Sequence, residues 1–159
     1  MLKTIIVAAV IIVVAIALFL FLKSRAVKPA SVQVRQIPEI VQQLRSKGQD
    51  TSWVVFMFTK RGETGDDDTV NLQFSVENGH AGLDWVLLAP RNIKDRDNIV
   101  AFARQRGVQI RERELNDVHY LRAEGKEAET LGVAIATEFY GLAGTDTIDM
   151  ISDKFDWHP

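Results

Sequence analysis

The sequence predicts an α+β domain with an antiparallel sheet, preceded by one transmembrane helix. Three observations lead to this fold class. Residues 5–22 form an apolar run without a charge, a glycine or a proline. Three segments of β-type composition, 52–59, 70–76 and 83–88, follow one another with short connections, which is typical of an antiparallel meander. Apolar residues then recur at helical spacing over 126–140, and helices packed on such a sheet make an α+β arrangement.

The apolar run 5–22 is long enough, at about 1.5 Å per residue, to cross the hydrocarbon core as a helix. The alternative is a cleaved signal peptide, whose apolar stretch of about 7–15 residues ends in small residues. Lys23, Ser24 and Arg25 follow the run instead, which favours a retained anchor. More basic residues follow the run than precede it, which favours a cytoplasmic location for the domain, with a periplasmic or extracellular location as the alternative.

The chain divides into an anchor with its flanks (1–25), a linker (26–36) and a soluble α+β domain (37–159). Residues 1–28 contain four basic residues and no acidic one, so the rest of the chain carries −6, against −2 for the whole. An acidic domain argues against nucleic acid as a partner, because nucleic-acid binding needs a basic face. The basic residues beside the apolar run favour anionic headgroups, so membrane lipid is an expected partner.

The first half of the domain is expected to contain two helices and three strands. A helix over 38–47 precedes the strand 52–59, which is apolar on both faces and therefore expected to be central. The segment 70–76 alternates between apolar and polar residues, as a half-buried strand does. A third strand over 83–88 and a helix over 94–106 follow.

A second hairpin is expected from strands at 108–114 and 118–123. Residues 111–114 (RERE) are charged on both faces of their strand. Natural edge strands use such charges to prevent unwanted pairing, so we expect an edge strand here. A charged docking edge is the alternative.

Two more helices complete the expected order. The helix over 126–140 has a strong amphipathic pattern. A short helix over 147–154 would place Ile148, Ile151 and Phe155 on one face.

The expected order after the anchor is therefore α-β-β-β-α-β-β-α, with the helices mainly on one face of the sheet. In this order, and in the positions of the strands WVVFMF (53–58) and LDWVLL (83–88), the chain resembles the type III secretion chaperone-like fold, which includes the YbjN and TY-Chap families. The resemblance covers residues 38–140. It implies a small dimeric domain that binds other polypeptides and catalyses no reaction. The anchor departs from the secretion chaperones, which are soluble, and no binding residue is carried over from these families.

The strands 52–59 and 83–88 carry large apolar side chains on both faces, which predicts that the sheet face without helices is also covered. Burying one of them is worth about 1.5–3 kcal/mol, so we expect either the C-terminal segment or another subunit to cover the face without helices. The candidate partner surface consists of four aromatic residues: Trp53, Phe56, Trp85 and Trp157.

No catalytic or cofactor motif is present. The chain has no cysteine, and it contains no GxSxG, P-loop or GxGxxG sequence. His80 with Glu77 and Asp84 has the residue types of a metal site, but the spacing fits no known site and a surface loop is the preferred interpretation. We therefore expect no catalytic residue, no metal and no cofactor.

These observations predict a membrane-anchored, non-enzymatic module that binds a partner protein, or a second copy of itself. The alternatives are an accessory subunit of a membrane complex and an anchored metal-dependent hydrolase using His80.

Overall fold

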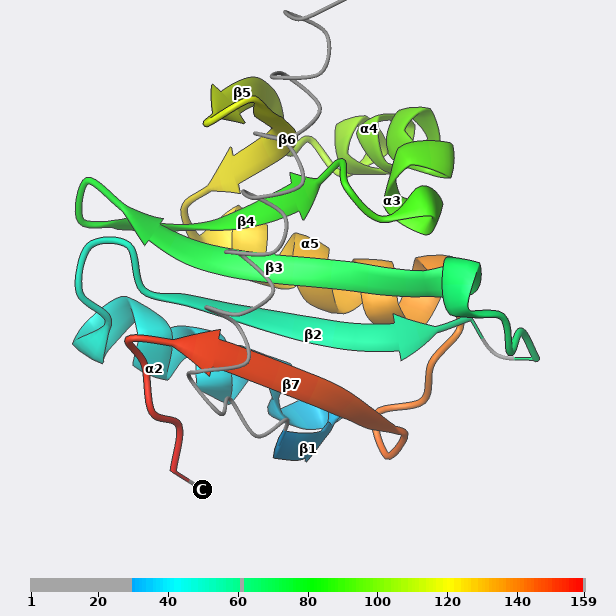
Figure 1. The fold of residues 1–159 in the computed structure, drawn as a ribbon, viewed down its shortest axis with the longest axis horizontal. Coiled ribbons are helices and arrows are strands. Elements are labelled where there is room, and N and C mark those ends of the chain that lie inside the picture. The colour runs from blue at the N-terminus through cyan, green and yellow to red at the C-terminus, as the bar shows by residue number, and fades with distance from the viewer. Residues whose placement is uncertain (1–29, 61, 159) are drawn as a thin grey trace, which may run out of the picture.

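The computed structural model describes residues 30–60 and 62–158. Seven strands form one antiparallel sheet in the order β1-β7-β2-β3-β4-β6-β5 (Figure 1). The strands are β1 (Ala30–Gln33), β2 (Trp53–Thr59), β3 (Thr69–Glu77), β4 (His80–Val86), β5 (Arg111–Leu115), β6 (Val118–Glu124) and β7 (Thr147–Asp153). The helices are α2 (Ile37–Lys47), α3 (Pro90–Lys94), α4 (Arg96–Gln105) and α5 (Lys126–Ala134), which continues as a π-helical turn over Ile135–Phe139.

The predicted fold class is wrong, although the α+β character is confirmed. The described part of the chain has seven strands where the sequence predicted five, and none of its helices has both the length and the apolar character needed to cross a membrane. The predicted transmembrane helix over 5–22 lies outside the described residues.

Strand β7 replaces the short helix that was predicted over 147–154. Ile148 and Met150 alternate with polar residues and are both buried, so the period of two decides the structure rather than the helical spacing of Ile148 and Ile151. Strand β7 lies between β1 and β2 and pairs with both.

The predicted linker 26–36 also needs correction, because its second part belongs to the folded domain. Residues Ala30–Gln33 form the edge strand β1, and Val32 and Val34 are buried in the core. Val32 lies directly opposite Ile148 of β7. A strand whose partner comes from the far end of the chain gives little local signal.

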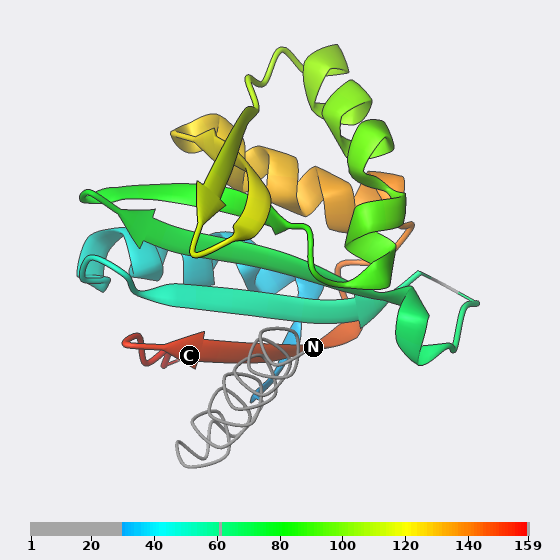
Figure 2. The same cartoon turned by 45° about the horizontal axis from the view of Figure 1, so that its top comes forward.

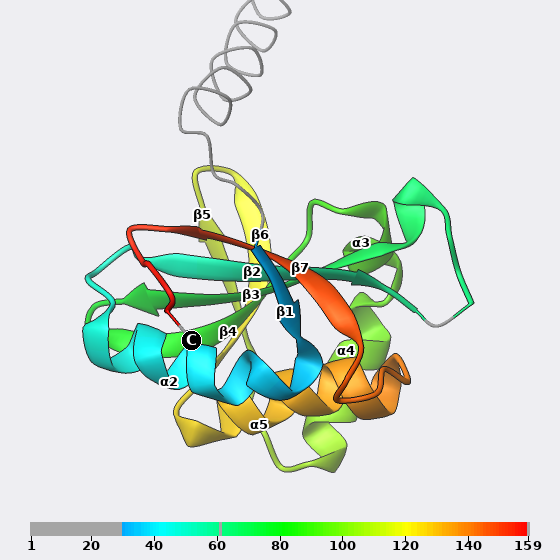
Figure 3. The same cartoon turned by 90° about the horizontal axis from the view of Figure 1, so that it is seen from below.

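The core lies between the sheet and the helices α2 and α5, which pack on the same face (Figure 3). Val54, Phe56, Leu72 and Phe74 point to this side from the central strands and are fully buried. On α5, Gly132 permits close contact, because a Cβ atom there would lie 2.3 Å from Cζ of Phe74. The meander β2-β3-β4 and the edge position of β5 are confirmed.

The opposite face of the sheet, which we call the open face, carries no helix of the described chain (Figures 1 and 3). Its β7–β2 half is apolar, with Trp53, Val55, Met57 and Ile151. Its other half, over β4, β6 and β5, is charged. Helix α4 lies beside the β5–β6 hairpin (Figure 2).

Candidate functional site

The charged half of the open face is built by the register of four strands. Gln73 of β3 lies opposite Asp84 of β4, Asp84 lies opposite Arg122 of β6, and Arg122 lies opposite Arg111 of β5. Because opposite residues in an antiparallel sheet point to the same face, these side chains form one row across the sheet. Arg113 belongs to the next row, on the same face.

Asp84 and Arg122 form a buried ion pair at the centre of this row. Arg122 Nη1 donates to Asp84 Oδ1 at 2.6 Å and to Ser75 Oγ at 3.0 Å. The Ser75 hydroxyl in turn donates to Asp84 Oδ2 at 2.5 Å. Both charged side chains are almost fully buried, with 1% and 2% of their surfaces exposed. A buried charge needs a partner with good geometry, and each member of this pair has one.

The remaining donors of Arg122 are also engaged. Nη2 donates to the backbone carbonyl of His80 at 2.9 Å, and Nε donates to Glu124 Oε1 at 2.9 Å. The guanidinium lies over Gly82, where a Cβ atom would come within 2.7 Å of its Cζ. Gly82 is therefore required because a side chain at this position would displace Arg122.

The pKa values of Asp84 and Arg122 are both raised, but by different causes. Burial raises the pKa of Asp84, although Arg122 and Ser75 act to lower it. Burial acts to lower the pKa of Arg122, but the charge of Asp84 and the bond to Glu124 raise it overall. Arg122 therefore stays protonated and serves to fix the strands, not to exchange protons.

The two tyrosines of the chain are both held in the protonated form. Tyr120 donates to Glu77 Oε1 at 3.0 Å, and burial together with this bond raises its pKa to about 12. Tyr140 donates to Asp95 Oδ2 at 2.8 Å, and burial followed by this bond raises its pKa as well.

We expect the folded chain to show little tyrosinate absorbance at pH 10, where a free tyrosine is about half ionised. Because both folded-state pKa values lie above the unfolded ones, the free energy of unfolding falls as the pH rises from about 10 toward 12. Spectrophotometric titration of the native and urea-unfolded chain measures this. Native titration with a midpoint near 10 would contradict the two tyrosine hydrogen bonds.

Strand β5 carries two arginines, Arg111 and Arg113, that form no ion pair in the described part of the chain. All five of its residues are exposed, and it forms the edge of the sheet. Among residues 30–60 and 62–158, Arg111 and Arg113 have no side-chain hydrogen bond or ion pair. Arg113 does lie close enough to Glu124 to contribute to that carboxyl's lowered pKa, after the larger effect of the bond from Arg122.

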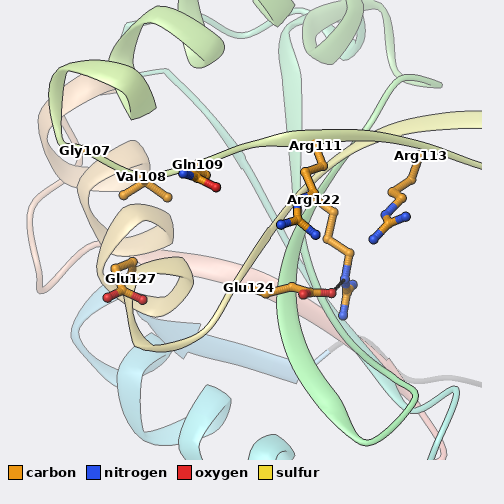
Figure 4. Close-up of a pocket in the computed structure, with 8 residues that line it drawn as sticks. All are labelled: Gly107, Val108, Gln109, Arg111, Arg113, Arg122, Glu124 and Glu127. Atoms are coloured by element: carbon orange, nitrogen blue, oxygen red, sulfur yellow. Dashed lines mark hydrogen bonds and ion pairs between the residues drawn. The ribbon is translucent and has the colours of Figure 1, made fainter.

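A pocket of about 310 Å³ opens beside these arginines. Its wall is formed by the loop residues Gly107, Val108 and Gln109, by Arg111, Arg113, Arg122 and Glu124 of the hairpin, and by Glu127 of α5. Figure 4 shows the three arginines on one side of this space, whereas Glu127 lies at the other end, below Val108. The pocket lies beside the start of β5, because the loop residues that precede this strand and the two arginines of the strand both line it.

A second polar cluster holds α3 and is complete in itself. Arg91 donates to Asp95 Oδ2 at 2.5 Å and to Glu63 Oε2 at 2.6 Å, and its guanidinium lies 5.4 Å from the centre of the Tyr140 ring. Asn92 bonds both the backbone N–H and the carbonyl of Asn71, where β3 extends beyond β4. This cluster joins α3 to the end of β3 that extends beyond β4.

The four residues predicted as a partner surface do not lie together. Phe56 and Trp85 are in the core, 0% and 1% exposed. Trp53 is half-buried on the open face, whereas Trp157 lies in the C-terminal segment and packs against the core. The next residue, His158, accepts a hydrogen bond from Gln43 of α2 through its backbone carbonyl. That a partner covers part of the molecule stays a prediction.

The residues considered for a metal site have other roles. Asp84 is bound to Arg122, and His80 contributes its backbone carbonyl to the same guanidinium while its side chain is exposed. In the described ranges no three His, Asp or Glu side chains are grouped so as to hold a metal ion.

Sequence reasoning missed the ion pair of Asp84 and Arg122. The available signal was one charged residue within each of two mostly apolar segments, 83–88 and 118–123, which predicts a buried charge with a partner. The register that joins the two strands does not follow from the sequence.

Comparisons with models of known protein families, with curated proteins and with solved structures gave no match to this chain. The resemblance to the type III secretion chaperone-like fold stays a prediction.

Proposed function

We propose that this chain is a non-enzymatic protein-binding module that binds an acidic segment of another polypeptide at the β5 edge. The observation that carries the proposal is the pair Arg111 and Arg113, which point from an open edge strand to the mouth of a pocket with no ion-pair partner in the described chain. Arginine binds carboxylates through two parallel hydrogen bonds, so unpaired arginines on an exposed edge are suited to acidic side chains.

The backbone of β5 adds to this preference. An edge strand presents unpaired N–H and C=O groups on its outer side, and extended peptides bind to such edges by main-chain hydrogen bonds. Strand β5 has β6 on one side only. The charges on β5 then select which peptides pair with it.

The buried ionisable groups favour binding over catalysis. A general acid or base needs a proton that it can exchange with a substrate. Asp84 is closed off by Arg122 and Ser75, and Asp95 is bonded to Arg91 and Tyr140. Both carboxylates thus have structural roles, which supports a module that acts by binding a partner through its exposed surface.

The proposal is tested by selecting random peptides for binding to the full chain by display. We expect the enriched peptides to be acidic and to bind the double variant Arg111→Glu/Arg113→Glu about 10- to 100-fold more weakly, since each reversal replaces an attraction by a repulsion. The matched control is Lys47→Glu/Lys94→Glu, which changes the net charge equally at exposed sites on α2 and α3.

The control variant is expected to bind the enriched peptides with nearly wild-type affinity. If enriched peptides bind the β5 variant and the wild type equally well, the proposal is wrong.

A further inference from the structure

We infer that the partner segment adds to β5 as an extended strand with acidic residues at two alternate positions, and that β5 of a second copy does not pair there. This inference rests on the proposed function and specifies the partner's chemistry. It comes from the way the charges of β5 divide between the two faces of the sheet.

The two faces of β5 carry charges of opposite sign. Glu112, which forms an ion pair with Arg96 of α4, and Glu114 lie on the helix side of the sheet. Arg111 and Arg113 project to the open face, where Arg111 lies directly opposite Arg122. The positive charge of this edge is therefore confined to the open face.

This division disfavours a two-fold dimer through β5. Opposite residues of an antiparallel pair share a face, so two copies related by a two-fold axis pair odd-numbered residues with odd-numbered ones. In the register centred on Glu112, Arg111 of each copy would lie opposite Arg113 and Glu112 opposite Glu112, and in the register centred on Arg113, Arg113 would lie opposite itself and Glu112 opposite Glu114. Like charges directly opposite one another are destabilising, so pairing of β5 with β5 of a second copy is unfavourable.

The same rule defines the partner that fits. Side chains at alternate positions of an added strand share one face, about 7 Å apart. Two acidic residues with this spacing would lie opposite Arg111 and Arg113, whereas the residues that flank them would face Glu112 and Glu114 and must be neutral or basic. Adjacent acidic residues do not fit, because one of them would point toward the glutamates.

The pocket gives one of the two acidic positions a further contact. It lies at the Arg111 end of β5, between the loop residues Gly107–Gln109 and the end of β6. A carboxylate opposite Arg111 would enter this space beside Arg113 as well (Figure 4). The strand edge and the pocket therefore act as one recognition surface.

Two peptides of identical composition separate strand addition from simple charge attraction. The first, TTVEVEVTT, places both glutamates on one face of a strand, and the second, TTVEEVVTT, places them on opposite faces. We expect the full chain to bind the first about tenfold more tightly, measured by isothermal titration calorimetry. Binding should also slow hydrogen exchange at those β5 amides that point away from β6.

Two variants complete the test. Arg111→Glu/Arg113→Glu is expected to lose the preference for TTVEVEVTT, whereas Glu114→Gln, a change on the opposite face of the same strand, is expected to keep it. If both peptides bind the wild type with equal affinity and both bind Arg111→Glu/Arg113→Glu more weakly, the chain binds acidic peptides but the inferred strand addition is wrong. Binding of neither peptide, or a β5–β5 dimer detected by exchange protection of β5 without peptide, also overturns the inference. Peptide binding that is indifferent to the reversal overturns the proposed function too.

Discussion

Replacing Arg122 by leucine is expected to destabilise the domain by about 3–5 kcal/mol, because it leaves the carboxylate of Asp84 buried without its counter-charge. Asp84 is 1% exposed, and its other side-chain partner in the described chain is the Ser75 hydroxyl. Urea denaturation followed by circular dichroism measures the change in the free energy of unfolding.

The double variant Asp84→Leu/Arg122→Leu provides the control within the same site. Removing both charges of a buried pair is far less costly than removing one, so we expect the double variant to be more stable than Arg122→Leu alone. Arg113→Leu, on the exposed neighbouring strand, should change stability by no more than about 0.5 kcal/mol. If the double variant loses as much stability as Arg122→Leu and Asp84→Leu lose together, the two residues are not coupled.

The single substitution Trp85→Ala is expected to lower the free energy of unfolding by about 3–5 kcal/mol, because it creates a cavity in the core. The indole is 1% exposed, stacks on Tyr140 with 6.4 Å between ring centres, and donates from Nε1 to the Asn92 carbonyl at 2.9 Å. Trp85→Phe keeps most of the volume but loses the donor, so it should cost less than Trp85→Ala.

Trp53→Ala is the matched control for this prediction, since it removes the same side chain from the open face. Trp53 is half-buried, and we expect a loss of about 1–1.5 kcal/mol, roughly half the value of full burial. Equal losses at the two positions, measured by denaturation, would contradict the assignment of Trp85 to the core and Trp53 to the open face.

The central part of this fold could be predicted because its partners are close in sequence. The meander β2-β3-β4 joins neighbouring segments through short loops, and the alternation over 70–76 identifies the inner face directly. The edge position of β5 followed from RERE, because so many charges exclude a strand from the interior.

The outer strands β1 and β7 could not be predicted from local pattern. They lie side by side although they come from opposite ends of the described chain. Residues 147–154 would place apolar residues on one side both as a helix and as a strand. Only the pairing of β7 with β1 and β2 shows that the segment is a strand. The interpretation as a helix failed because tertiary pairing overrides a short periodic signal.

The site shows the same limit. Each of Asp84, Arg111 and Arg122 is visible in the sequence as a charged residue in a strand, but the row they form depends on the register of β4, β6 and β5. The partner surface was predicted from large aromatic residues on strands that are apolar on both faces. Phe56 and Trp85 point to the helix side, and the face of each strand that the helices cover is a property of the whole fold.

Calorimetric titration of one selected acidic peptide into the wild type, Arg111→Glu/Arg113→Glu and Lys47→Glu/Lys94→Glu tests the central claim most directly. The account predicts tight binding to the wild type and to the lysine variant, and a loss of about tenfold or more with the arginine variant. Equal affinity for all three proteins would show that the β5 edge is not where this domain binds its partner.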